Sequence, residues 1–524
     1  MSHTAALHGS AKEDVLNALH NQFTVDDQTL FKITQTFFSE ISDGLSSYDS
    51  PTFVKGVPDG SETGTFLALD LGGTNLRVCE VTLLGDQTFS IRQQKYKVSE
   101  TLKTGEVTTL FDYLADSVDA FLTDASSESY DSHTSHVNEE DAPYVSLALT
   151  FSFPVEQSAL DSGVLLTWTK GFSAKNAIGK DVVKLLQDAF DRKHIHVKCV
   201  ALVNDTVGAL LSRAYTSGGC ILGAIFGTGT NGAYVEEVSK ITKLGDSPAV
   251  AAGGEMIVNT EWGAFNNSRS ALPTTPYDNK LDRESINPGF QAFEKFISGM
   301  YLGEIARNVI LSLIDAAPKP LLFGGQSSAL LNKQWGLDTA VLSEIEEAWE
   351  ATVQGSIKAQ EEKLRRIQGI LAQRLELSPQ HVSLADADIV RQVCTLIASR
   401  AARMSGTAVA AILVHTGPGI KVPAGLKDEG KRIGVGVDGS LVEFYPNFQA
   451  KLRASLRTLV GPEVESHVDI GMAKDGSGAG AALCALVAQR QSQASHTNGT
   501  YAHDPEHIKV TARTEVAYLS SLSR

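Results

Sequence analysis

The chain has 524 residues, of which 42% are hydrophobic and 20% are charged, and its formal net charge at neutral pH is -16. A chain of this length is expected to hold more than one domain, and its composition is typical of a soluble globular protein. The negative charge argues against general binding to nucleic acid or to an anionic membrane, because such partners need basic patches. It does not argue against a nucleotide, since backbone amides and a metal ion can hold phosphate groups.

Five cysteines are scattered among mostly apolar neighbours, without metal-ligand spacing and in an odd number. This usage is typical of reduced, buried thiols in a cytoplasmic protein. Residues 1–14 lack the apolar segment of a secretory signal, and we find no run of about 18 apolar residues that would predict a membrane-spanning helix. We therefore expect a cytoplasmic protein with no membrane partner.

Apolar residues recur with helical or strand-like periodicity along most of the chain, and the resulting alternation of helices and strands favours an α/β fold. In chain order we first expect a loosely ordered start at 1–24, a helix at 30–45, a loop at 51–64, a strand hairpin at 66–81, a strand at 90–98, a helix at 110–123 and a polar surface loop at 124–142. A strand at 144–153, a helix at 180–193, a strand at 197–203 and a second hairpin at 222–236 follow. The remainder is expected to form helices at 293–314, 343–373 (with a break at Gly355 as an alternative) and 387–414, a strand at 431–437, a helix from the glycine-rich turn at 474–480 to about 490, and a tail.

The two hairpins share one plan, in which a tight glycine turn separates two apolar strands. The first turn is Asp70-Leu-Gly-Gly-Thr-Asn75, and the second is Gly227-Thr-Gly229. Glycines let backbone N–H groups turn toward one point, and two such turns could hold the two ends of a polyphosphate. Neither turn fits the P-loop or the dinucleotide fingerprint, and the alternating residues that follow predict antiparallel strands. For either turn taken alone, a plain β-hairpin turn is an equally good interpretation.

Asp205 follows the strand at 197–203 and is the first candidate for a general base, which must lie within about 3 Å of the hydroxyl it deprotonates. The alternative interpretation of Asp205 is a helix N-cap. Other parts of the chain contain carboxylate, amide and hydroxyl side chains that suit a polyhydroxyl ligand. Taken singly, each of these residues is more often part of a turn or of the surface. The turns at Asp438-Gly-Ser440 and Asp475-Gly-Ser477 could hold a nucleoside or its α-phosphate, or could be ordinary turns. The polyhydroxyl candidates are Ser152, Thr169, Lys170, Asn204, Glu261 and Glu294.

Taken together, these motifs resemble the eukaryotic hexokinase/glucokinase family. The resemblance covers about residues 26–488, and it is specific because many independent motifs keep their order and approximate spacing. The set of motifs occurs once, as in single-copy members of the family. The residues within the motifs are more similar to those of fungal glucokinases than to those of hexokinases with a broad substrate range. The matching stretches are 69–78, 149–154 with 168–172, 203–208, 226–232, 259–265, 293–295, 437–440 and 475–478.

The resemblance implies a two-lobed, actin-like (ribonuclease H-like) sugar-kinase fold of the α/β class, with the sugar in a cleft between the lobes. The small domain would comprise residues 66–203 plus about 470–490, and the large domain residues 12–65 plus 204–469. Residues 491–524 would form a C-terminal tail.

The resemblance also implies roles for single residues. Asp205 would be the base, and Lys170 and Thr228 would stabilise charge on the transferring phosphoryl group. The substrates would be ATP and glucose, and Mg²⁺ would arrive with ATP, with Asp70 as a candidate contact. Glucose would be held by Ser152, Thr169, Lys170, Asn204, Asp205, Asn231, Glu261 and Glu294. ATP would be held by Asp70, Gly72, Gly73, Thr74, Asn75, Arg77, Lys95, Gly227, Thr228, Gly229, Gly299, Thr339, Ser343, Gly439, Ser440 and Ser477.

These features predict a kinase that moves the γ-phosphoryl group of ATP to O6 of glucose, the first step of glycolysis. Phosphoryl transfer needs chiefly alignment and charge neutralisation, which this set of residues can supply. One alternative is a catalytically weak glucose sensor, but the intact base and phosphate turns favour an enzyme. Another is an actin-like ATPase scaffold, which would have no use for the sugar motif at 168–172 or for the pair of Glu261 and Glu294.

Overall fold

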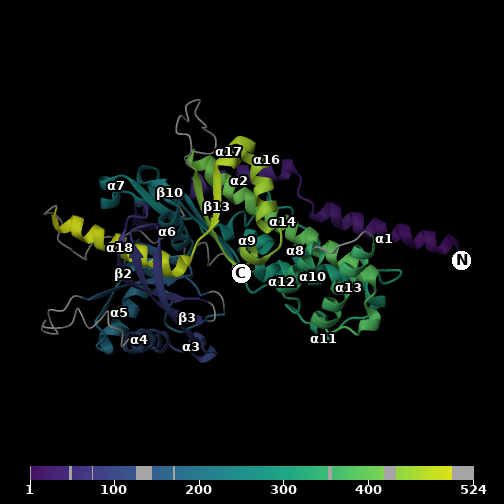
Figure 1. Ribbon diagram of the computed structural model, residues 1–524, viewed down its shortest axis with the longest axis horizontal. Helices are drawn as coiled ribbons and strands as arrows, with labels where there is room; N and C mark the ends of the chain where they lie inside the picture. Colours follow the sequence, from purple (N-terminus) through teal and green to yellow (C-terminus); the bar gives the residue numbers. More distant parts are fainter. Residues whose placement is uncertain are drawn as a thin grey trace, which may run out of the picture.

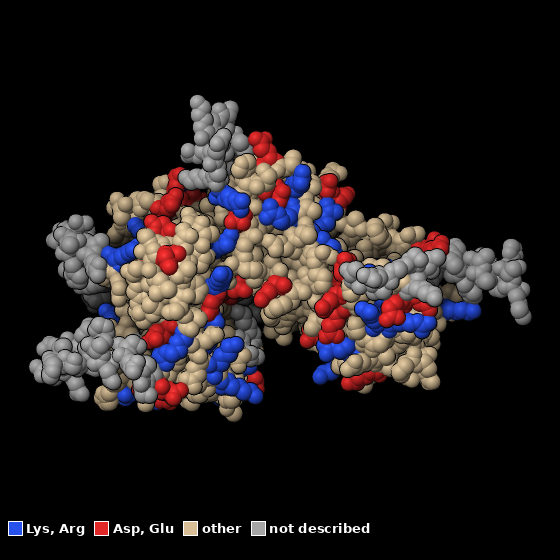
Figure 2. Space-filling model, in the orientation of Figure 1, with Lys and Arg blue, Asp and Glu red and all other residues tan. Residues whose placement is uncertain are grey.

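A computed structural model describes residues 2–46, 50–72, 75–124, 144–168, 171–351, 357–417 and 432–497 (Figure 1). Two separate β-sheets organise this part of the chain, and they lie in different lobes. In Figure 2 the surface is indented between the lobe that holds the first sheet and the part that holds the helices between residues 276 and 374.

The first sheet has five strands in the order β4 (Phe89–Lys97), β3 (Asn75–Leu84), β2 (Thr63–Leu71), β5 (Val145–Phe151) and β8 (Val197–Val203). The β2–β3 and β3–β4 pairs are antiparallel, whereas β2–β5 and β5–β8 are parallel. Alternate residues of β2 enter two different cores: Leu67 and Leu69 face α4 (Val107–Asp124) and α5 (Val182–Arg192), and Phe66 and Ala68 face α18 (Gly476–Thr497). This alternation is the two-residue period of a strand that is buried on both faces.

The second sheet has six strands in the order β1 (Ser50–Lys55), β11 (Glu255–Asn259), β10 (Thr230–Glu237), β9 (Leu222–Phe226), β12 (Ile433–Asp438) and β13 (Val468–Met472). The β9–β12 and β12–β13 pairs are parallel and the others are antiparallel. One face packs on the largest hydrophobic core, to which α2 (Asp27–Gly44), α10 (Gly299–Ile314), α14 (Leu384–Thr416) and α16 (Phe448–Val460) contribute.

Helix α6 (Asp205–Ser217) and helix α18 pack against each other between the two sheets. Helix α6 directly follows β8 of the first sheet but lies on β9 and β12 of the second, while α18 lies on the first. Gly208 and Gly480 meet at this contact, where a Cβ on Gly480 would overlap the backbone of Gly208. The chain thus crosses between lobes immediately beside Asp205.

The remaining elements are peripheral to the sheets. They are α1 (Ser2–Phe23), α3 (Glu100–Thr104), the β6 (Val155–Ala159) and β7 (Ser162–Leu165) hairpin, α7 (Pro248–Ala252), α8 (Pro276–Glu284), α9 (Ala292–Ile297), α11 (Ala329–Asn332), α12 (Thr339–Glu350), α13 (Ile357–Arg374), α15 (Ser440–Phe444) and α17 (Pro462–His467). Among them, α8, α11, α12 and α13 lie in the part of the molecule drawn at the right of Figure 1.

Helix α14 is long and apolar enough to cross a membrane by length and composition, although no such helix was expected from the sequence. Within its most apolar window, 83% of the residues are buried inside the protein. A core helix of a soluble protein passes the same test, so this finding is weak grounds for a membrane span.

Several expected elements are wrong in detail. Residues 2–23 form α1 rather than a loose start, and its last turn is held by Leu19 and Phe23 in the large core. The expected loop at 51–64 contains β1, an edge strand, which is where a strand tolerates a residue such as Pro51. The hairpin of β6 and β7 was not expected.

Two expected helices are each divided. The helix at 293–314 is broken at Ser298, whose backbone is extended (φ -90, ψ 154). In the expected helix at 343–373, α12 ends at Glu350 and α13 begins at Ile357, while the alternative break at Gly355 lies outside the described residues. Helix α18 continues to Thr497, seven residues into the expected tail. The rest of that tail and nearly all of the loop at 124–142 lie outside the described residues, and the division into two domains stays a prediction.

Candidate active site

Both glycine turns join antiparallel strands, as the sequence predicts. Leu71 pairs with Leu76 across the first hairpin, and the Gly72 N–H donates to the Asn75 carbonyl over 3.1 Å. Gly73 and Thr74, at the tip of this turn, lie outside the described residues. In the second hairpin Phe226 pairs with Thr230, and the N–H of Gly227 donates to the carbonyl of Gly229 over 3.0 Å.

The second turn is joined to the starts of two helices that carry predicted nucleotide residues. The Gly299 N–H donates to the Gly227 carbonyl (2.8 Å), and the Met300 N–H donates to the Thr228 carbonyl (3.1 Å). The Thr339 hydroxyl donates to the Gly299 carbonyl (2.5 Å) and accepts from the Gly303 N–H (2.8 Å). The break before Gly299 therefore has a tertiary cause, because it turns the start of α10 against this hairpin.

Gly439 and Ser440 lie beside the same turn. A Cβ on Gly227 would come within 3.1 Å of the Gly439 Cα, and Gly439 has φ 114, a conformation that favours glycine. Ser440 begins α15, and the Ser343 hydroxyl of α12 is 3.5 Å from the carbonyl of Phe444 at the end of α15. The predicted nucleotide residues of the large lobe thus form one contiguous region around the second turn.

In the other lobe, Arg77 connects the first hairpin to the start of α18. Its guanidinium pairs with Asp70 (3.2 Å) and with Asp475 (2.8 Å) and donates to the Ser477 hydroxyl. The Ser477 carbonyl accepts from the Thr150 hydroxyl over 2.9 Å. The structure therefore brings Asp70, Arg77 and Ser477 together. Exposed Lys95 lies opposite Arg77 in the register of β3 and β4.

The Asp205 carboxylate lies within electrostatic reach of both lobes. Burial raises the pKa of Asp70, and the negative charge of Asp205 raises it further, against the lowering effect of Arg77. Burial likewise raises the pKa of Asp438 at the end of β12, and Asp205 again adds to the rise. The charge of Asp205 is therefore felt both at Asp70, next to the last residue of β2, and at Asp438, the last residue of β12.

The alternative role of Asp205 as a helix N-cap is wrong, because Asn204 is the N-cap of α6. The Asn204 side-chain oxygen accepts from the Thr206 N–H (3.0 Å) and from its hydroxyl (2.6 Å). Asp205 is the first residue of the helix, and one of its carboxylate oxygens accepts from the Thr206 N–H over 2.9 Å. Because Asn204 caps the helix, the second carboxylate oxygen of Asp205 is available for other partners.

Two predicted sugar residues and one unexpected residue form a hydrogen-bonded group on β10, on β11 and in the turn that follows β11. The Glu261 carboxylate accepts from Asn259 (2.7 Å) and from Asn231 (3.2 Å), and Asn231 also donates to the Asn259 side-chain oxygen (2.9 Å). Glu261 has left-handed backbone angles (φ 48, ψ 40), which cost about 1–3 kcal/mol in a residue other than glycine and gather at functional sites. Glu294 is close by, since its carboxylate accepts from the N–H of Thr230 over 3.0 Å.

Ser152 follows β5 directly, and β5 is the parallel neighbour of β8, which ends just before Asn204. Ser152 and Asp205 thus leave the same edge of the sheet, where ligands of α/β proteins bind. Thr169 and Lys170 lie outside the described residues. The residues on either side of them are fixed by aromatic packing: Trp168 stacks on Phe172 with ring centroids 5.4 Å apart and meets Phe153 edge-on at 4.9 Å.

Comparison with known proteins assigns the chain to a family. Family models described as hexokinase match residues 15–215 and 221–487. The chain is 42% identical to a glucokinase of Aspergillus niger over 507 residues, which cover 92% of this chain and 98% of that protein. It is 38% identical to glucokinase-1 of Saccharomyces cerevisiae over 525 residues, covering 92% and 99% of the two chains.

The chain belongs to the hexokinase family. A solved hexokinase from Schistosoma mansoni, described as complexed with glucose, matches with a TM-score of 0.76 and 33% identity, over 92% of this chain and 99% of that one. The predicted family and the predicted two-lobed α/β sugar-kinase fold are therefore confirmed, and the chain is a hexose kinase.

Asn259 is the residue of this hexokinase site that the sequence interpretation left out. It is 7% exposed at the end of β11, two positions before Glu261. Because Glu261 lies beyond the end of β11 and has left-handed backbone angles, no strand period links it to Asn259, and only the fold shows that the two side chains meet. Asp438 was considered only as part of a turn that could hold a nucleoside or its α-phosphate, and only the fold shows that it lies near Asp205.

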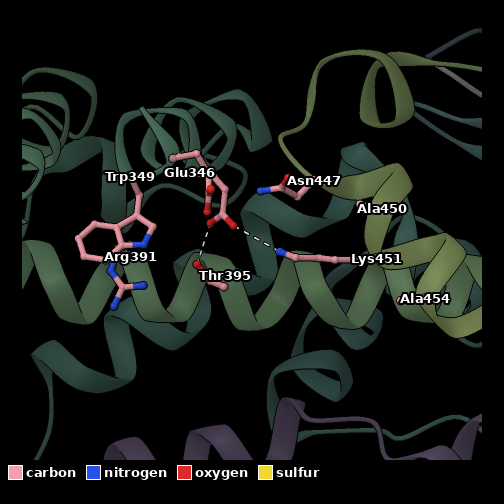
Figure 3. A pocket seen from close by; sticks show the side chains of 9 residues that line it. Glu346, Trp349, Arg391, Thr395, Asn447, Ala450, Lys451 and Ala454 are labelled. Atoms are coloured by element: carbon pink, nitrogen blue, oxygen red, sulfur yellow. Dashed lines mark hydrogen bonds and ion pairs between the residues drawn. The ribbon is translucent and has the colours of Figure 1, made fainter. Parts of the chain in front are cut away.

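A separate hollow of about 370 Å³ lies between α12, α14 and α16, lined by nine residues (Figure 3). At its centre the buried Glu346 carboxylate accepts from the Thr395 hydroxyl (2.7 Å) and pairs with Lys451 (3.3 Å). Arg391 covers the ring of Trp349 at 4.1 Å. The hollow contains none of the predicted sugar or nucleotide residues, and the charge of Glu346 at its centre is paired with Lys451, so we interpret it as a contact region between helices.

Proposed function

We propose that this hexokinase-family chain transfers the γ-phosphoryl group of ATP to O6 of D-glucose, giving glucose 6-phosphate and ADP. The observation that carries the proposal is the position of Asp205, at the start of α6 and within electrostatic reach of carboxylates in both lobes. Relatives of the chain are named glucokinase and hexokinase, and a structural neighbour was solved with glucose. These names support glucose as the substrate and glycolysis as the setting.

In this proposal the sugar binds beside the second glycine turn. Carboxylates accept hydrogen bonds from sugar hydroxyls, and amide and hydroxyl groups both donate and accept. Glu261 and Glu294 are held by neighbouring N–H groups, so both are positioned before the sugar arrives. The residues assigned to glucose are Ser152, Thr169, Lys170, Asn204, Asn231, Glu261 and Glu294, to which we add Asn259.

Asp205 would accept the proton of the attacking hydroxyl. Its neighbour Asn204 fixes the first turn of the helix, so the carboxylate is placed by backbone that is already capped. Charge that develops on the transferred group would be stabilised by Lys170 and Thr228 and by the N–H groups of the glycine turns. The nucleotide would extend along the region formed by Gly299, Thr339, Ser343, Gly439 and Ser440.

Mg²⁺ is part of the proposal as the ion that accompanies ATP. Mg²⁺ is held by one or two carboxylates together with phosphate oxygens, and buried carboxylates near the phosphate turns fit that requirement. Asp70 is the candidate contact, directly or through water. When bound, the ion would neutralise phosphate charge. In the described part of the chain no group of three His, Cys, Asp or Glu side chains is placed to hold a metal ion.

We also propose a cytoplasmic location, with glucose and ATP as the partners and with neither nucleic acid nor membrane involved. All five cysteines are buried and unpaired, which is the usual state of thiols in a reducing compartment. The net charge of -16 is unfavourable for polyanionic partners.

The proposal is tested by following ADP release with glucose, fructose, mannose or no sugar. We expect turnover that depends on a hexose and is highest with glucose, and sugar phosphorylated at O6. Hydrolysis of ATP that is indifferent to every hexose would overturn the proposal in favour of an ATPase. Binding of glucose without ADP release would overturn it in favour of a sugar sensor.

A further inference from the structure

A carboxylate outside the site just described ties three separate segments together. Asp282, near the end of α8, is 13% exposed and pairs with Lys295 (2.7 Å) and Arg269 (2.6 Å). Both of its oxygens also accept from the N–H of Gly289, each over 3.1 Å. Lys295 is the more deeply buried partner at 3% exposed, and it makes a second hydrogen bond of 2.7 Å to the carbonyl of Asn287.

The segments joined at Asp282 are those that carry the two sugar-site glutamates. Lys295 immediately follows Glu294 on α9, and Arg269 lies in the segment that begins at Glu261. The two segments are also linked directly, because the Asn267 side-chain oxygen accepts from the N–H of Ala292, the first residue of α9, over 3.1 Å.

The loop from Ser285 to Gln291 completes the connection. Gln291 is left-handed (φ 53), and its side chain packs so tightly on Gly263 that a Cβ there would overlap it. Helix α9 has only six residues, and a helix this short depends on tertiary contacts to persist. The place of the Glu294 carboxylate is therefore set by these contacts and by the ion pair at Lys295.

The ion pair between Asp282 and Lys295 stabilises this arrangement. Burial opposes the ionised form of Asp282, but hydrogen bonds from Lys295 and Gly289 outweigh it and hold the pKa of that carboxyl below its usual range. The charge of Glu294 is felt at Lys295, which places the sugar-site carboxylate near the same pair. Removing Asp282 would leave the buried Lys295 without its ion-pair partner, and removing Lys295 would leave Asp282 with Arg269 alone, so the surrounding loop would have to rearrange.

We propose that Asp282 and Lys295 are positioning residues for the sugar: their buried ion pair fixes Glu294 and, through Arg269, Glu261, so its loss weakens the hold on glucose more than the hold on ATP. This proposal rests on the proposed function, because it takes glucose as the ligand of both glutamates.

The test compares Asp282→Asn and Lys295→Met with the unaltered chain. We expect the KM for glucose to rise roughly tenfold or more, since small displacements of a binding group have effects of this order. The KM for ATP should change less than about twofold, and the rise in Tm that glucose produces should shrink. Lys295→Arg should restore part of the glucose affinity because it keeps the charge.

A matched control is Arg307→Met, which removes an equally buried basic side chain (3% exposed) from its ion pair with Glu304 on α10. This variant should lower Tm without changing the KM for glucose.

If either pair variant folds poorly, Arg269→Gln, at a more exposed position, provides the same comparison. An unchanged KM for glucose in variants of lower Tm would overturn the proposal, because the pair would then be merely structural. Absence of hexose-dependent turnover in the unaltered chain would instead refute the proposed function, and the glucose-induced rise in Tm would still test the ion pair.

Discussion

Asp70 and Asp205 are both carboxylates beside the predicted phosphate turns, but the protein treats them differently. Asp70 is buried against Arg77, and burial together with the charge of Asp205 raises its pKa above the usual 3.8. A carboxylate in such a place opposes folding at neutral pH and is expected to persist for function. Asp205 is instead the half-buried first residue of a helix, whose positive end favours a negative charge.

Asp70→Asn tests this difference through pH. A carboxyl whose pKa is higher in the folded state than in the unfolded state loses its proton more readily when the chain unfolds. The free energy of unfolding therefore falls as the pH rises from the unfolded-state pKa to the folded-state pKa. The variant should therefore have a higher Tm than the unaltered chain at neutral pH, and the difference should vanish below about pH 4. Melting curves at a series of pH values check this. A Tm lower than that of the unaltered chain at pH 7 would show that the pairing with Arg77 outweighs the burial of Asp70.

Residue-level prediction from the sequence was strongest where a motif is local. The helix start at Asn204-Asp205 and both glycine hairpins were predicted as structures because each pattern lies within a few consecutive residues. Asn259 was left out because its role arises from a side chain of another strand, Asn231 on β10. The Asp282–Lys295 pair joins residues of two helices across an irregular loop, which no local pattern indicates.

At the scale of whole elements, the α6–α18 contact shows how closely two helices can approach. Gly208 and Gly480 face each other there, and each lacks the side chain that would separate the helices. Because α6 carries Asp205 and α18 carries Ser477, this contact sets the distance between the candidate base and one nucleotide residue.

Gly480→Ala should destabilise the protein, although alanine is the better helix former. The added methyl group would overlap the Gly208 backbone, and overpacking of this kind costs about 1–3 kcal/mol. Gly369→Ala on α13 is the matched control, since nothing lies within 4 Å of a Cβ there. It should stabilise the chain by up to about 1 kcal/mol. Melting temperatures of both variants check the pair, and equal stabilisation by the two would contradict close packing at Gly480.

Elements with strong periodicity were predicted well, and those shaped by distant contacts were not. The strand at 197–203 has the predicted bounds, and α2 and α14 differ from prediction by a few residues. The break at Ser298 was missed because it depends on a hydrogen bond from Gly299 to Gly227, 72 residues earlier in the chain. Helix α1 was missed because its apolar residues follow no clear helical period, although Leu19 and Phe23, with Val15 and Leu16 beside them, pack on the core.

At the scale of the whole molecule, the candidate residues are divided between two lobes. The nucleotide region and the Asn231–Glu261 group belong to the large lobe, while Asp70, Arg77 and Ser152 belong to the lobe of the five-stranded sheet. The order of motifs along the sequence predicted this two-lobed arrangement through family resemblance. Composition and periodicity alone predicted only an α/β class.

We predict that glucose draws the two lobes together, because residues assigned to it occur in both. Closure would exclude water that could otherwise accept the phosphoryl group. Small-angle X-ray scattering should show a smaller radius of gyration with saturating glucose than without it, and Glu261→Gln should require more glucose for the same change. An identical scattering profile with and without glucose would contradict closure.

The most direct test of the account is the turnover of Asp205→Asn with saturating ATP and glucose, measured beside glucose binding by calorimetry. We predict that kcat falls about 10²- to 10⁴-fold, the range for loss of a general base, while the Kd for glucose changes only a few-fold. Turnover within about twofold of the unaltered chain would contradict the assignment of Asp205 as the base.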